Sequence, residues 1–239
     1  MARSLDLAHP LVAELLGRCA FGPAGEVTCA VSGGADSLSL LVLAVASGRT
    51  VTAVHVDHGL RPGSAEEAHV VADAAAASGA AFRAERAEVA PGPDLEARAR
   101  VARFAVLPPG ALTGHTADDR AETVLLNLLR GAGPAGLAGI RRGPTKPLLD
   151  LRRADTAALC EALGLRPVVD PSNADPAHRR NRVRHEVLPL LADVGDRDPV
   201  PVLVRQADLL AAVDEALGAR AAALDPTPAA DLRGAPLAV

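Results

Sequence analysis

Residues 32-SGGADS-37 lie between two apolar runs, 27-VTCAV-31 and 38-LSLLVLAVA-46. The first run is typical of a short buried strand and the second of a buried helix, so the six residues form the turn that joins them. Gly33 and Gly34 let the backbone adopt positive φ angles and come close to a ligand. Amides in such a turn and at the start of the next helix carry partial positive charge, which favours the binding of a phosphate group.

An aspartate in this turn indicates what kind of phosphate site it is. The turn matches neither the GxxxxGK[ST] nor the GxGxxG pattern. A carboxylate beside phosphates is repulsive unless a cation lies between them, so we predict that Mg²⁺ bridges Asp36 and a bound nucleotide. The alternative is that Asp36 only caps the helix. The predicted nucleotide contacts are the residues of the turn: Ser32, Gly33, Gly34, Ala35, Asp36 and Ser37.

Strand-like and helical segments alternate over the first half of the chain. Apolar and β-branched runs predict strands at 27–31, 50–56, 82–89 and 111–113. Helical patterns lie between and after them, at 36–47, 64–78, 94–107 and 118–130. This order predicts an α/β fold: a Rossmann-like open parallel sheet with helices on both faces.

The second half of the chain has a different composition. A long loop rich in Gly and Pro is predicted at 131–147, followed by helices at 155–164, 182–192 and about 200–223. We therefore expect a catalytic domain over residues 1–195. A short helical extension with a Pro/Ala-rich tail is expected over 196–239.

Composition excludes several classes of protein. The chain has 239 residues, 49% of them hydrophobic, which predicts a packed core. The apolar run 40–46 is far shorter than the ~20 residues of a membrane span, and charges within 5–16 argue against a signal peptide. The three cysteines show no CxxC spacing, so we expect a reduced, cytoplasmic protein. The net charge of −4 argues weakly against a nucleic-acid partner, but arginines gather in 178-HRRNRVRHE-186.

Four polar residues share one face of the helix predicted at 118–130. His115, Asp118, Asp119 and Glu122 are spaced i, i+3, i+4 and i+7. Acids at a helix start also stabilise the helix dipole, which is the simpler alternative. Because the carboxyl ends of parallel strands meet at one edge of the sheet, we predict that these acids and the 32–37 turn flank one crevice.

Several blocks of sequence together resemble one enzyme family. They are the SGGxDS turn, 55-HVDHGLR-61, 114-GHTADDRAETVLLNLLRGAGPAGLAGI-140, 147-PLL-149, 170-DPSN-173 and 180-RNRVRHEVLP-189. The turn is similar to the PP-loop of the N-type ATP pyrophosphatases. The full set resembles the tRNA(Ile)-lysidine synthetases, over roughly residues 26 to 190. Many members of that family carry further domains after the catalytic one, whereas a helix and a tail follow here.

The resemblance implies a reaction and its partners. ATP would activate the wobble cytidine of tRNA(Ile) with a CAU anticodon through an adenylated intermediate. L-lysine would then be joined at C2, with release of AMP and pyrophosphate. ATP is thus the co-substrate and Mg²⁺ its metal, and a homodimer is one expectation for the assembly.

The resemblance also assigns roles to side chains. Asp119 and Glu122 would contact the ammonium groups of lysine, and Asp118 and His115 would support them or carry protons. Arg184 would contact the transferring α-phosphoryl group. For Arg180 and Arg182, contacts with tRNA phosphates are implied, with a solvated basic face as the alternative.

Two other functions fit parts of the pattern. A PP-loop tRNA thiolation enzyme would use paired cysteines, and Cys19, Cys29 and Cys160 are not so arranged. A nucleotide-binding sensor without catalysis would give no reason for acids around the predicted crevice.

Overall fold

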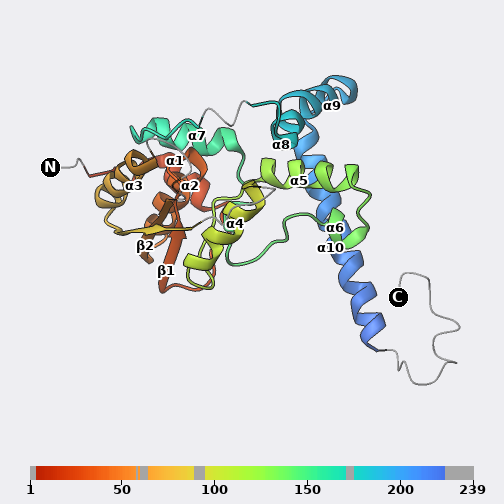
Figure 1. The fold of residues 1–239 in the computed structure, drawn as a ribbon, viewed down its shortest axis with the longest axis horizontal. Coiled ribbons are helices and arrows are strands. Elements are labelled where there is room, and N and C mark those ends of the chain that lie inside the picture. Colours follow the sequence, from red (N-terminus) through yellow and green to blue (C-terminus); the bar gives the residue numbers. More distant parts are fainter. Residues whose placement is uncertain (1–3, 58, 60–63, 89–94, 171–174, 224–239) are drawn as a thin grey trace, which may run out of the picture. The chain divides into compact units, whose positions relative to one another are not determined.

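The computed structural model describes residues 4–57, 59, 64–88, 95–170 and 175–223 (Figure 1). The chain forms two compact units: Met1–Ala117 with Arg142–Asn173, and Asp118–Arg141 with Ala174–Val239. The domain boundary predicted after residue 195 divides the chain differently and stays a prediction. The predicted tail and residues 171–173 of the DPSN block lie outside the described residues.

A parallel sheet forms the centre of the first unit. Its strands are β1 (Glu26–Ala30), β2 (Thr50–Asp57) and β3 (Ala81–Arg86), in the order β1-β2-β3. Leu112 forms a single parallel bridge with Cys29 on the other side of β1. The strand predicted at 111–113 is therefore only a bridge, in which the Leu112 amide donates to the Thr28 carbonyl and the Leu112 carbonyl accepts from Ala30.

Helices surround the sheet in the predicted order. The first unit contains α1 (Pro10–Leu16), α2 (Ala35–Ala46), α3 (Ser64–Ser78), α4 (Leu95–Val106) and α7 (Arg153–Ala162). The helix α2 is apolar on nearly all sides, and such a helix is stable only when it is surrounded. It accordingly contacts β1, β2, α1, α3 and α7, and its residues 37–44 are buried. The predicted α/β class is confirmed.

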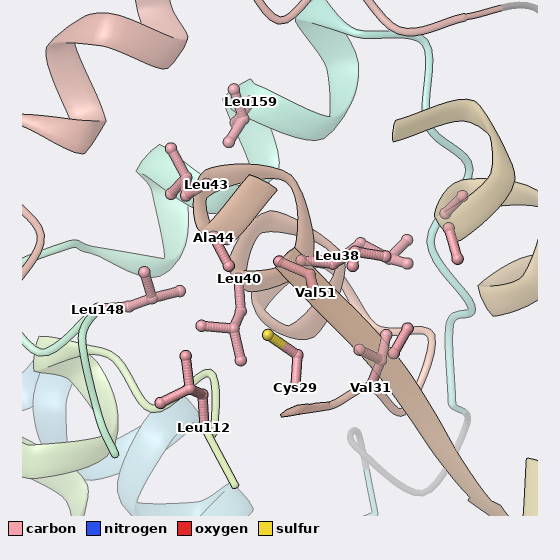
Figure 2. Close-up of a cluster of buried hydrophobic side chains, with 14 of the residues drawn as sticks. Cys29, Val31, Leu38, Leu40, Leu43, Ala44, Val51, Leu112, Leu148 and Leu159 are labelled. Carbon is pink, nitrogen blue, oxygen red and sulfur yellow. The ribbon is translucent and has the colours of Figure 1, made fainter. Parts of the chain in front are cut away.

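The core of this unit forms around α2 (Figure 2). Leu40 and Leu43 of this helix lie near Cys29 of β1, Leu148 and Leu159, and all five side chains are buried. Burying one such leucine contributes about 1.5–3 kcal/mol. Because the start of α2 is held in this core, the turn before it has a fixed place at the end of β1.

The second unit is helical. It contains most of α5 (Ala117–Leu129), then α6 (Pro134–Leu137), α8 (Arg179–Arg182), the π-helical turn η2 (Val183–Val187), α9 (Leu188–Gly195) and α10 (Pro199–Ala222). The loop predicted at 131–147 thus holds one short helix, and the helix predicted at 182–192 is broken into three parts. A π-helical turn of this kind is frequent at functional sites.

Ion pairs tie α10 to this unit. The guanidinium of Arg120, which is 1% exposed, donates to Asp208 at 2.6 Å. Arg141 pairs with Asp214. These pairs join α10 to residues 118–141, and so explain why that segment forms one unit with the C-terminal part of the chain.

None of the helices within the described ranges has both the length and the apolar character that crossing a bilayer requires.

Candidate active site

The hydroxyl group of Ser37 holds the 32–37 turn together by hydrogen bonds within it. The Ser37 Oγ donates to the carbonyl of Gly34 at 2.9 Å and accepts from the amide of Ser32 at 3.1 Å. It also lies 3.2 Å from the Ser32 Oγ. Ser37 is buried, whereas Ser32 is exposed. Ser37 therefore shapes the turn, and Ser32 is the exposed serine of the pair. The predicted contact of Ser37 with a nucleotide stays a prediction.

Two glycines are required by the space around the turn. Gly33 has a φ of +90°, and a Cβ there would lie 3.0 Å from the Val168 side chain. At Gly114, a Cβ would lie 2.7 Å from the carbonyl oxygen of Asp36, closer than atoms can approach without a shift. The segment that leads to His115 therefore passes directly against the start of α2. Only glycine permits this approach.

Asp36 lies in the first turn of its helix and is not the N-cap residue. Helix α2 begins at Ala35, and Gly34 at its N-cap position makes no side-chain capping bond. Instead, the Thr156 hydroxyl donates to Oδ1 of Asp36, and Nε of Arg153 lies 3.7 Å from Oδ2. Both charged side chains are partly exposed, Asp36 at 26% and Arg153 at 29%. The carboxylate thus keeps access to solvent and to a ligand beside an amide-rich turn.

His115 lies in the same unit as this turn. Its Nδ1 is 2.8 Å from the Thr113 hydroxyl, and the Leu112 bridge to β1 holds the segment beside the strand that leads into the turn. The structure therefore brings His115 to the same end of the sheet as the 32–37 turn.

The acid cluster of the second unit is closed by two arginines. Glu122 is fully buried. Its Oε2 accepts from Arg180 Nε at 2.7 Å, and its Oε1 accepts from Arg184 Nε at 2.7 Å. Arg184 Nη2 adds a third bond to Glu122, at 3.2 Å. Both carboxylate oxygens are therefore engaged by guanidinium groups.

Asp119 balances the charge of this cluster. Its Oδ1 lies 3.4 Å from Arg180 Nη2, and its carbonyl oxygen lies 3.3 Å from the same nitrogen. Two carboxylates and two guanidinium groups make the cluster formally neutral. Asp118 lies in the first turn of α5 and is half-buried.

Arg182 lies in a different environment from its two neighbours. It is 59% exposed and pairs with Glu186 one turn later. The hydrogen bond with Arg182 lowers the pKa of the Glu186 carboxyl. Arg182 also lines a pocket of about 320 Å³, together with Leu126, Leu129, Arg130, Arg179, Val183 and Val187. This pocket combines an aliphatic surface with three cationic groups.

The cysteines are not arranged for sulfur chemistry. Burial raises the pKa of Cys29 and that of Cys19 to about 12, and it also raises the pKa of Cys160. Reactive cysteines have the opposite shift, since the thiolate is the nucleophile. All three are unpaired thiols.

The described residues hold no group of three or more His, Cys, Asp or Glu that could enclose a metal ion. Mg²⁺ at a nucleotide site is commonly held by one or two carboxylates together with substrate phosphates. A single partly exposed carboxylate, Asp36, beside a turn suited to phosphate fits that mode of binding.

Sequence reasoning missed Thr156 and gave Arg153 no role. Neither belongs to a motif around the turn, because 120 positions of sequence separate Thr156 from Asp36. A weak signal was present: both residues follow the 147-PLL-149 block within one helical turn of each other.

Comparison with known proteins identifies the family of this chain. The model of the PP-loop domain family matches residues 11–191. The tRNA(Ile)-lysidine synthase of Salinispora tropica is 49% identical over 223 residues, which cover 84% of this chain and 67% of the relative. That of Rhodococcus jostii is 49% identical over 188 residues, covering 73% and 57%. The chain thus spans between about half and two thirds of the length of such relatives.

A solved structure shares the fold. The U34-tRNA thiolase NcsA from Methanococcus maripaludis, with its [4Fe-4S] cluster, superposes with a TM-score of 0.62 over 85% of this chain and 80% of its own. The two sequences are only 15% identical, so the likeness concerns the fold alone.

Proposed function

Because this chain belongs to the tRNA(Ile)-lysidine synthase family of PP-loop proteins, we propose that it joins L-lysine to C2 of the wobble cytidine of tRNA(Ile). The tRNA would carry a CAU anticodon, and ATP would supply the activation. The observation that supports this most strongly is that the family's blocks supply both an open carboxylate in an anion-binding turn and a carboxylate–arginine cluster.

In the first step, the C2 carbonyl oxygen of the cytidine attacks the α-phosphorus of ATP. Pyrophosphate leaves, and the tRNA becomes adenylated. The amides of the 32–37 turn and the Ser32 hydroxyl would bind the phosphates as negative charge develops on the leaving group. Asp36 would hold Mg²⁺, which supplies neutralisation of that charge when bound.

In the second step, the ε-amine of lysine attacks C2 and AMP leaves. An amine nucleophile must be unprotonated, and free lysine has a pKa of about 10.4. A nearby group must therefore take up a proton. We propose Asp118, which lies one turn before Glu122 on α5, or His115 for this role. The prediction that His115 shares this helix face is wrong, because α5 begins at Ala117.

The lysine site would work by exchange of cations. Asp119 and Glu122 remain the proposed contacts of the ammonium groups. Because both oxygens of Glu122 accept bonds from arginines, an ammonium at Glu122 would replace a guanidinium group rather than join it. Arg184, displaced in this way, would be available to the transferring α-phosphoryl group.

Contacts with tRNA would involve the arginines of the second unit. Arg180 is engaged with Glu122, so a tRNA phosphate would compete with that carboxylate for it. Arg182 is more exposed and lines a pocket with two further arginines. Guanidinium groups of this kind suit RNA phosphates. A homodimer stays a prediction.

One assay tests the proposal. The protein is incubated with labelled ATP and tRNA(Ile) carrying a CAU anticodon, with lysine, with a sulfur donor or with neither. We expect AMP release that depends on tRNA, and incorporation of lysine into the tRNA. Incorporation of sulfur would favour a thiolation enzyme, and ATP binding without any product would favour a nucleotide sensor. Either result would contradict the proposal.

A further inference from the structure

We infer that Thr156 is a positioning residue for Asp36: its hydroxyl fixes the carboxylate in the orientation that binds the metal–nucleotide complex. The inference rests on the proposed use of ATP at the 32–37 turn. Thr156 belongs to α7, which lies outside the turn and its two flanking elements.

Buried side chains attach α7 to the start of α2. The Ser39 hydroxyl donates to the carbonyl of Thr156 at 3.0 Å, and the Cys160 thiol lies 3.6 Å from the carbonyl of Ala35. Ser39 and Thr156 are fully buried, and Cys160 is 2% exposed. Because buried groups in close packing have little freedom to shift, these contacts fix Thr156 relative to the first turn of α2, which carries Asp36.

The Thr156 hydroxyl has a single proton and two acceptors within reach. Its Oγ1 lies within hydrogen-bond distance of Asp36 Oδ1 and, at 2.9 Å, of the Arg153 carbonyl oxygen. Both partners only accept, and a hydroxyl has one proton to donate. The ionised carboxylate is the stronger acceptor. The proton is therefore directed to Asp36, and the contact with Arg153 alone does not account for the position of the hydroxyl.

The other carboxylate oxygen of Asp36, Oδ2, has a different neighbour. With Oδ1 held by Thr156, Oδ2 is the oxygen that faces a cation, Nε of Arg153 at 3.7 Å. That distance is too long for a hydrogen bond and is typical of a loose ion pair. A metal ion bound to a triphosphate would approach this same oxygen. Thr156 thus separates the two oxygens of Asp36 into one that is fixed and one that binds the cation.

The test compares variants at one position. Thr156→Val removes the hydroxyl while it keeps the branched shape, Thr156→Ala removes the hydroxyl without that bulk, and Thr156→Ser keeps the hydroxyl. Ser78→Ala is the matched control, because Ser78 is also buried in a helix and its hydroxyl donates to the carbonyls of Ala74 and Ala75. Circular dichroism identifies the variants that fold.

Binding is measured without turnover, by electron paramagnetic resonance of Mn²⁺ with a non-hydrolysable ATP analogue. We expect the Val and Ala variants to bind the Mn²⁺–nucleotide complex at least about tenfold more weakly, since the lost hydrogen bond is one to a charged group. Thr156→Ser should restore the affinity to within about threefold of wild type. Binding of the analogue in EDTA, and the affinity of Ser78→Ala, should be unchanged.

Two outcomes would overturn the inference: wild-type affinity in the folded hydroxyl-free variants, or an equal loss in the Ser variant. The Asp36→Asn variant separates this from failure of the proposed function. If Asp36→Asn weakens Mn²⁺–nucleotide binding but the hydroxyl-free variants do not, the role of Thr156 is wrong. If Asp36→Asn also binds normally, the metal assignment itself is wrong.

Discussion

Two candidate functional carboxylates, one in each unit, have opposite surroundings. Asp36 is 26% exposed; it accepts from the Thr156 hydroxyl, and Nε of Arg153 lies 3.7 Å from its Oδ2. Glu122 is fully buried and accepts three bonds from two arginines. Under the proposed function, a metal ion would join Asp36, whereas a cation at Glu122 would have to replace a guanidinium group. The two carboxylates thus differ in that one stays accessible to solvent and the other is neutralised by the protein's own arginines.

The largest effect is expected when Asp36 loses its charge. Asp36→Asn should reduce pyrophosphate release by about 100-fold or more, because it removes the charge that holds the cation at the leaving group. The measurement is pyrophosphate release with tRNA and ATP. Asp150→Asn is the control: Asp150 is exposed and pairs with Arg142 on the surface. A near-normal rate in Asp36→Asn would show that this carboxylate does not hold a cation needed for pyrophosphate release.

A second large effect is expected at Glu122. Glu122→Gln should lower the free energy of unfolding by about 3 kcal/mol, because it leaves Arg180 and Arg184 without the buried charge that they share. It should also raise the KM for lysine. Urea denaturation measures the first effect and lysine incorporation the second. Glu186→Gln, which alters an exposed pair with Arg182, should leave the denaturation midpoint in place. Equal stability of the Glu122→Gln and wild-type proteins would show that the arginines do not depend on this carboxylate.

A smaller effect is expected at Arg182, outside the neutral cluster. Arg182→Ala should weaken tRNA binding several-fold and reduce the slope of log K against log[salt] by about 0.9, as for one lost phosphate contact. Fluorescence anisotropy at several salt concentrations measures both. Arg220→Ala near the end of α10 is the control, since Arg220 is also exposed. An unchanged salt slope for Arg182→Ala would place the tRNA elsewhere.

The smallest effect is expected from thiol reagents. All three thiols lie in the unit that holds Asp36, and burial raises the pKa of Cys19 to about 12. Because burial raises the pKa of Cys29 to about 12 and raises that of Cys160, very little thiolate is present near pH 8. Iodoacetamide at that pH should therefore leave the rate of AMP formation unchanged in the folded protein. Rapid inactivation, prevented by ATP, would point to sulfur chemistry at the nucleotide site.

The fold and the phosphate turn could be predicted because their signals are local. Apolar runs of strand and helix length surround 32-SGGADS-37, and Gly33 and Ser37 occur where the backbone needs them. The positive φ expected at Gly34 is not observed, since its φ is −72°. The predicted strand at 111–113 is reduced to one bridge at Leu112, and on its other side the amide of Thr113 donates to the carbonyl of Thr145. That partner lies 32 positions away, and no periodic pattern indicates it.

The surroundings of the carboxylates could not be predicted, because they depend on contacts distant in sequence. Arg180 and Arg184 are one helical turn apart, which placed them on one face, but nothing in their spacing indicated Glu122 some 60 positions earlier. The prediction that Asp119 and Glu122 contact lysine, and that the acids share a crevice with the 32–37 turn, stays a prediction.

The closure of the turn by Ser37 has a thermodynamic consequence. Its hydroxyl bonds with Ser32 and Gly34 hold the turn in shape before any nucleotide arrives. The conformational entropy of these residues is therefore already lost on folding, so nucleotide association need not include the cost of ordering them. Calorimetry of ATP-analogue binding should then give a heat-capacity change that matches the buried ligand surface alone, without the excess that accompanies folding of a loop.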